Sequence, residues 1–368
     1  MRIEWQLAFW FLMLVLAGLG LYMSASVLAP FVAALILGYV LDPVADRLQR
    51  LGLSRLLATL VILAVFVVVL TIVIFVLAPV LGRQVVGFAE SLPVYAAKLQ
   101  SLITEQAAEF LQKYGGDWLQ KLGIDSASAN ESIQKSLGNF VGQGVQWFGN
   151  FLKSIWSGGQ ALVGIVTLTV ITPVVTFYLL LDWDEMIAVL HSLVPPRYRP
   201  AVLEIATEID RALSGFLRGQ SLVCLFLGLW YGVGLSMIGL NFGFLIGTSA
   251  GLLSFIPYVG SLTALIFSAV VAIVQGWPSL GLFGEALAVV GVGQFLEGNF
   301  LTPKLVGGSV GLHPVWLIFA LLAFGSLFGF AGMILAVPAA AAFGVVVRFA
   351  ARRYKQSTLF HGMDIGPT

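Results

Sequence analysis

The sequence has little charge for its length. Asp, Glu, Lys and Arg make up 10% of its 368 residues, while hydrophobic residues make up 59%. Soluble domains carry about 25% charged residues, and the mean hydropathy of +0.98 lies far on the apolar side. The formal net charge of +1 excludes the broad positive field by which proteins bind nucleic acid. We therefore predict that lipid is the main solvent of this chain, and that nucleic acid is not a partner.

Cysteine and histidine are also scarce. The single cysteine, Cys224, excludes an intrachain disulfide and any metal site that needs several cysteines. His191, His313 and His361 are far apart, and the sequence has no H-E-x-x-H, P-loop or dinucleotide-binding motif. Residues 307–311 match the G-x-S-x-G motif of hydrolases, but they lack its strand, helix and distant partner residues. The sequence thus predicts no catalytic residue, metal or cofactor, and a protein that is not an enzyme.

The sequence does contain many long apolar runs. A hydrocarbon core about 30 Å thick is crossed by a helix of roughly 20 apolar residues. Only α-helices and closed β-barrels satisfy their backbone groups in lipid. Barrel strands would alternate polar and apolar residues, whereas these runs are continuously apolar. The predicted fold class is an all-α integral membrane protein, a polytopic helical bundle of about eight spans or, alternatively, about ten.

Residues 1–81 are predicted to hold the first three spans, at about residues 5–23, 27–41 and 56–80. The N-terminus mimics a secretory signal peptide, but a second apolar segment follows directly, which favours a hairpin of spans over a cleaved leader. Asp42-Pro43 is expected to end the second span, because proline lacks the N–H that a helix needs. A short amphipathic stretch then leads to Arg50.

Residues 82–160 differ from the segments on either side. Charged residues such as Arg83, Glu90 and Lys98 recur through them, and apolar residues return at helical spacing. We predict that this segment is an extramembrane insert of amphipathic helices.

Residues 161–350 are predicted to form the transmembrane transport region, with a cytoplasmic amphipathic helix at about 197–218. Short apolar segments interrupted by glycine and proline are typical of the discontinuous helices and re-entrant hairpins of secondary transporters. Arginine-rich short loops place the chain's start on the cytoplasmic side by the positive-inside rule. By the same rule, residues 351–368 are predicted to be a cytoplasmic tail.

Glycine and proline mark two patterns in this region. Residues 253–260 and 328–332 both show a helix, a break and a second helix, which is either an internal repeat framing a binding site or a chance similarity. Gly243, Gly247 and Gly251 recur every four residues, so another helix can approach closely. This glycine stripe serves either ordinary helix packing or a sliding surface.

A few residues in this region are candidates for the transport path. Glu297 is an ionisable group at membrane depth, which is costly and usually functional, and Lys304 could pair with it. The alternative is that Glu297 ends a span at the interface, and Glu285 is a weaker candidate. Pro257 and Gly260 break a helix and free backbone groups for a substrate, unless they form only a tight turn.

At these positions the sequence resembles the autoinducer-2 exporter family, the PerM-like permeases. The resemblance rests on F-I-P-Y-V-G at 255–260, Q-F-L-E-G-N at 294–299, P-K-L-V-G at 303–307 and G-L-H-P at 311–314. Residues 37–43, 328–329 and 336–338 fit as well. The matching positions extend the candidate transport residues to the following set: Pro257, Gly260, Gln294, Glu297, Asn299, Pro303 and Lys304.

The resemblance implies a multi-pass protein of the bacterial inner membrane that assembles as a homo-oligomer, with a pentamer expected. It implies export of a small furanosyl signalling molecule in some members and monovalent cation/proton exchange in others.

Three functional hypotheses remain open at this point. The first is a secondary exporter of a small polar solute, for which neutral groups such as Gln275, Gln294 and Asn299 are suited. The second is a cation/proton antiporter in which Glu297 or Glu285 titrates. The third is a non-transporting scaffold that presents residues 82–160 to a partner.

Overall fold

The structure, a computed structural model of the chain, describes residues 13, 20, 25–110, 135–136, 138–139, 142–143, 167–307 and 311–357. In these ranges the regular secondary structure is helical, with eight α-helices and two π-helices. Four of the described helices are long and apolar enough to cross a membrane. The predicted all-α membrane fold is therefore confirmed, while the total of about eight spans stays a prediction.

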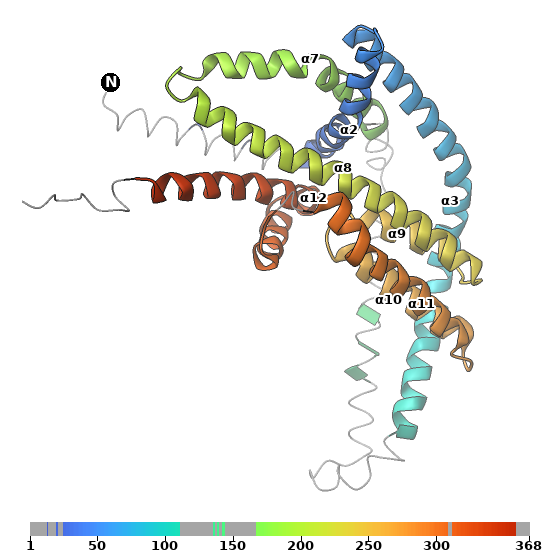
Figure 1. Ribbon diagram of the computed structural model, residues 1–368. Helices are drawn as coiled ribbons and strands as arrows, with labels where there is room; N and C mark the ends of the chain where they lie inside the picture. Colours follow the sequence, from blue (N-terminus) through green and yellow to red (C-terminus); the bar gives the residue numbers. More distant parts are fainter. Residues whose placement is uncertain are drawn as a thin grey trace, which may run out of the picture. The chain divides into compact units, whose positions relative to one another are not determined.

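Several predicted segments fall outside those ranges. They are nearly all of the first span, most of residues 111–160, and the end of the tail. The described helices are shown in Figure 1 and are α2 (Ala25–Arg50), α3 (Arg55–Phe110), η2 (Thr167–Ile171), α7 (Thr172–Leu193), α8 (Arg199–Met237), α9 (Gly243–Leu253), α10 (Val259–Gly276), α11 (Gly281–Leu296), η3 (Glu297–Val306) and α12 (Pro314–Lys355).

The chain divides into two compact units. The first unit comprises Met1–Leu70, Ile165–Val223 and Glu297–Thr368. The second unit comprises Thr71–Gly164 and Cys224–Leu296. Helices α3 and α8 each continue from one unit into the other.

Helix α2 corrects one expectation, because Asp42-Pro43 lies inside it and the helix continues to Arg50. The proline leaves the Tyr39 carbonyl, four residues earlier, without its helical donor. The Nε of Arg218 on α8 donates to that carbonyl oxygen at 2.7 Å. A side chain distant in sequence thus satisfies the backbone group that the proline frees, and the helix does not end there.

Helix α3 is unbroken over 56 residues, through the expected boundary between the third span and the insert at residue 82 (Figure 1). At about 1.5 Å per residue such a helix is roughly 84 Å long, against about 40–45 Å for a bilayer with its headgroups. Its length supports the prediction that its later part lies outside the hydrocarbon. The helix does not end at residue 82, and the membrane boundary there stays a prediction.

Helix α8 similarly joins two predicted elements, the amphipathic helix at 197–218 and the following span, into one helix of 39 residues. Gly219 lies just after the end expected for the amphipathic helix. In the structure it makes room instead, because a Cβ at this position would overlap the backbone oxygen of Leu305 on η3. Further along α8, in the second unit, Leu227, Tyr231 and Leu235 are each fully buried.

Both segments of the helix–break–helix pattern form tight turns. Between α9 and α10 the turn contains Tyr258 with a φ of 69°. In α12 the helix breaks at Gly329, with φ 60° and ψ −140°, a conformation that favours glycine. A Cβ at Gly332 would overlap the Phe324 carbonyl oxygen, so the chain doubles back on itself there. The residues before and after Gly329 are the two arms of α12.

Candidate functional site

A partly buried hydrogen bond joins α8 and α11 in the second unit. The Nε2 of Gln294 donates to the hydroxyl of Tyr231 at 2.9 Å. Tyr231 is fully buried, and a Cβ at Gly293 would overlap its ring. Because unsatisfied polar groups are costly in an apolar interior, the side-chain amide and the hydroxyl stabilise each other. The arrangement places neutral donor and acceptor groups inside an otherwise apolar set of helices.

The segment that follows α11 is a π-helix, η3, in the first unit. It contains Glu297, Asn299, Pro303 and Lys304. π-Helices account for less than about 1% of residues in proteins and occur frequently at functional sites. Four of the seven candidate transport residues therefore lie on one rare backbone element, which the apolar periodicity of the sequence did not predict.

The suggested pairing of Glu297 with Lys304 stays a prediction. The Lys304 Nζ lies 5.9 Å from the centroid of the Phe300 ring. Residues seven apart share a face in an α-helix, with about 3.6 residues per turn. The i→i+5 hydrogen bonding of a π-helix puts more residues in each turn, so seven residues no longer complete two turns.

Pro257 lies in the turn between α9 and α10, and Gly260 lies in the first turn of α10. The turn makes its own backbone hydrogen bonds, including one from the N–H of Val259 to the carbonyl of Ile256 at 3.2 Å. A Cβ at Gly260 would overlap Ser254 Oγ, a buried hydroxyl. This geometry favours the tight-turn alternative for both residues. Their part in binding a substrate stays a prediction.

The glycine stripe on α9 faces α8. A Cβ at Gly247 would overlap the backbone of Gly232, and a Cβ at Gly251 would overlap Gly228. At Gly243 a Cβ would lie 2.7 Å from the carbonyl carbon of Leu235. The two backbones are in direct contact along the stripe, which supports the proposed packing role.

Gln275 was expected to suit a hydroxylated solute, but it is engaged in a loop. Its Oε1 accepts from the backbone N–H of Asn241 at 2.8 Å, and its Nε2 donates to the Gly239 carbonyl at 2.9 Å. Both ends of the amide thus hold the connection between α8 and α9. We conclude that Gln275 has a structural role in this conformation.

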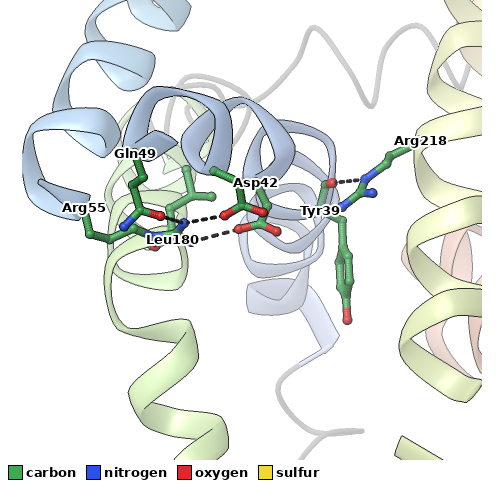
Figure 2. Close-up of polar contacts among 7 residues, drawn as sticks. Tyr39, Asp42, Gln49, Arg55, Leu180 and Arg218 are labelled. Carbon is green, nitrogen blue, oxygen red and sulfur yellow. Dashed lines mark hydrogen bonds and ion pairs between the residues drawn. The ribbon is translucent and has the colours of Figure 1, made fainter. Parts of the chain in front are cut away.

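The sequence interpretation missed a charged cluster in the first unit, which Figure 2 shows around Arg55. The guanidinium of Arg55 donates to Asp42 Oδ1 at 2.8 Å and to Asp46 Oδ1 at 3.0 Å. It also donates to Gln49 Oε1 at 3.0 Å and, through Nε, to the Leu180 carbonyl at 2.7 Å. The cluster connects the end of α2, the start of α3 and α7.

A signal for this cluster exists in the sequence. Asp42 and Asp46 are four residues apart and share one face of a helix, and Arg55 begins the next apolar run. We expected the helix to end at Asp42-Pro43, so Asp42 and Asp46 were not recognised as neighbours on one helix face. The Leu180 carbonyl could not have been foreseen, since it lies 125 residues away in the sequence.

The chain is similar to membrane transport proteins over nearly its whole length. The AI-2E family transporter model matches residues 11–352. YrrI of Bacillus subtilis (strain 168), provisionally named a transport protein, is 28% identical over 322 residues, covering 88% of this chain and 86% of YrrI. PerM of Escherichia coli (strain K12), provisionally named a permease, is 29% identical over 340 residues, 91% of each chain. The AI-2 transport protein TqsA of Escherichia coli (strain K12) is 25% identical over 333 residues, covering 89% of this chain and 87% of TqsA.

Proposed function

Because the chain belongs to the AI-2E family of transporters, we propose that it is a secondary transporter that exports a small polar solute across a bacterial inner membrane. The observation that carries the proposal is the Tyr231–Gln294 hydrogen bond. A neutral amide and hydroxyl are placed beside fully buried apolar residues of α8. Such groups suit a neutral solute that offers hydroxyl groups of its own.

The choice of solute follows from charge. Between residues 219 and 347 the sequence has three formally charged residues, Glu285, Glu297 and Lys304. A strongly ionic solute would need more countercharge than this, because isolated charges are costly at membrane depth. TqsA, at 25% identity, is named an AI-2 transport protein. We therefore propose an autoinducer-2-like signalling molecule as the first solute to test.

A cation/proton antiporter is the second candidate, and Glu297 is the observation that favours it. Glu297 is a half-buried residue of η3. A titratable group on a rare backbone element is a suitable proton carrier. A scaffold without transport is the third candidate, and it predicts no flux of either kind.

We also propose that the protein works as a homo-oligomer in the bilayer, with the pentamer implied by the family resemblance. The first part of α3 is apolar and exposed on the single chain, as at Val65 (57%) and Phe75 (78%). Lipid or a second copy of the chain would cover this surface.

The test is flux in proteoliposomes, with labelled autoinducer-2 first and then sodium with a pH-sensitive dye. We compare wild type with Tyr231→Phe, which removes one hydroxyl, and with Glu297→Gln. Tyr178→Phe is the matched control, because Tyr178 is 58% exposed on α7.

Solute flux that falls in Tyr231→Phe but not in Tyr178→Phe is the expected result. Sodium-driven proton movement that disappears in Glu297→Gln, without solute flux, would favour the antiporter. Absence of both solute flux and sodium-driven proton movement would favour the scaffold.

A further inference from the structure

The loop between α8 and α9, residues 238–242, is held by contacts from other helices. Phe242 has a φ of 59°, a left-handed conformation that is uncommon for a bulky residue. The side chain of Gln275 on α10 bonds the Gly239 carbonyl and the Asn241 N–H. The loop is thus fastened to the end of α10, the second arm of the hairpin α9–α10.

The second half of α3 contacts the same loop through one face. Gln84, Phe88 and Tyr95 are spaced by four and seven residues, so they share a face of the helix. The Tyr95 hydroxyl accepts from Asn241 Nδ2 at 3.1 Å. The Phe242 ring packs edge-on against Phe88, with ring centroids 5.2 Å apart, and against Tyr95 at 6.2 Å.

Gln84 also caps the start of α9. The first N–H groups of a helix have no partner inside it, and an N-cap side chain normally accepts from the N–H two or three residues on. Phe242 is the N-cap residue of α9 and has no side-chain oxygen. The Oε1 of Gln84 accepts from the Leu245 N–H at 2.8 Å instead. Helix α9 therefore begins with a cap that another helix supplies.

The cap makes the position of α9 depend on α3. Along its length α9 contacts α8 through the glycine stripe, where little shift is possible without separating the backbones. At its start the position of α9 is set by Gln84 and by the loop that Phe88 and Tyr95 hold. A displacement of α3 would therefore first move the start of α9. Through the bonds of Gln275 to the loop, it would also move the end of α10.

We propose that the second half of α3 positions the hairpin α9–α10 for transport, with Gln84 and Tyr95 as positioning residues. This inference rests on the proposed function, since it assigns those residues a role in turnover. The hairpin carries the F-I-P-Y-V-G segment in its turn. The capped N–H of Leu245 is already satisfied, so Gln84 acts on the hairpin and not on the solute.

The test combines amide hydrogen exchange with solute flux on the reconstituted full chain. The variants are Gln84→Leu, which removes the cap, and Gln84→Glu, which keeps a side-chain oxygen. Glu90→Gln on α3 is the control, because Glu90 is exposed and changes charge without touching the cap. Tyr95→Phe removes the hydrogen bond between Tyr95 and Asn241. It tests the same contact of α3 with the loop if Gln84→Leu does not fold.

In Gln84→Leu we expect exchange at the start of α9 to rise roughly fivefold, the ratio that corresponds to the loss of a typical cap. Exchange in α11 should be unchanged. Maximal solute flux should fall several-fold while the KM for the solute stays constant, and Gln84→Glu should restore both values.

Three results would overturn the inference. Unchanged exchange at α9 in Gln84→Leu would mean that the cap does not position the hairpin. Faster exchange with unchanged flux would mean that the contact is structural alone, and it would leave the proposed function intact. Absence of flux in wild type would remove the proposed function, and with it the role in turnover.

Discussion

The two units of this protein are held together internally by different chemistry. In the first unit, ion pairs join helices, as where Arg55 bonds Asp42 and Asp46 (Figure 2) and where Arg352 bonds Glu204 and Glu208. Neutral bonds, such as that from the Thr172 hydroxyl to the Pro30 carbonyl, accompany them. In the second unit, the bonds between helices use neutral groups. Examples are Gln84 to Leu245, Tyr95 to Asn241, and Gln294 to Tyr231.

This difference follows from the cost of burying charge. A carboxylate or guanidinium loses far more hydration than an amide when it leaves water. Charged contacts therefore cost little free energy where the side chains stay partly exposed. The Asp42 side chain, for example, is 34% exposed. Neutral contacts and glycine stripes can join helices without that loss of hydration. The comparison predicts that substitutions in the two units will fail for different reasons.

The largest effect on stability is expected for Arg55→Ala. It removes four hydrogen bonds and leaves two carboxylates close together without a cation. A fully buried pair that loses one partner costs about 3–5 kcal/mol. Because the side chains of Asp42 and Asp46 are 34% and 49% exposed, we expect a smaller loss of about 2–3 kcal/mol.

The measurement is chemical unfolding of the purified protein in detergent. Arg50→Ala is the control, because Arg50 is exposed at the end of α2 and should change stability by less than about 0.5 kcal/mol. Equal effects of the two substitutions would contradict the view that charged contacts hold the first unit together.

The second unit should be sensitive to volume instead of charge. In Gly251→Ala the new Cβ would overlap the backbone of α8 at Gly228, which cannot move aside as a flexible side chain would. Overpacking of this kind costs about 1–3 kcal/mol, and we expect about 2 kcal/mol.

Gly284→Ala on α11 is the matched control for this substitution. A Cβ at Gly284 has nothing within 4 Å, and alanine is a better helix former by up to about 1 kcal/mol. The control should therefore be neutral or stabilising in the same unfolding assay. A destabilised Gly284→Ala, or an unaffected Gly251→Ala, would show that backbone contact does not determine packing in this unit.

The sequence predicted the helical class well because apolar composition determines it. The breaks near Pro257 and Gly329 were also predictable, since glycine and proline act locally on the backbone. The helix end expected at Asp42-Pro43 was wrong, because α2 continues there to Arg50. Its continuation depends on a contact that the local residues do not encode, the Arg218 bond to the Tyr39 carbonyl.

The candidate site was predictable only in part. Glu297 stood out because charge is so rare around it, and Gln294 because it matched a family segment. The π-helix of η3 could not be predicted, because its hydrogen bonding leaves no simple periodicity in ten residues. Tyr231 was missed because one tyrosine in an apolar run resembles any other core residue. Its importance depends on Gln294 lying 63 positions away in the sequence but 2.9 Å away in space.

The smallest effect is expected at the second charged contact of the first unit. Arg352 Nη2 lies 2.9 Å from Glu208 Oε1 and 3.3 Å from Glu204 Oε1, which joins the end of α12 to the start of α8. The Arg352 side chain is 47% exposed, so water and salt screen the attraction. Exposed ion pairs contribute about 0.2–1 kcal/mol, and we expect Arg352→Gln to cost about 0.5 kcal/mol.

Salt separates this contact from the Arg55 cluster. Raising the ionic strength to about 1 M shortens the screening length to roughly 3 Å. The difference between wild type and Arg352→Gln should then disappear, while the difference for Arg55→Ala should largely remain because Arg55 is only 15% exposed. If both differences vanished in salt, charge alone would join the helices of the first unit. If neither changed, the Arg352 contact would depend on packing of its side chain against neighbours such as the Phe349 ring, whose centroid lies 6.0 Å from Arg352 Cζ.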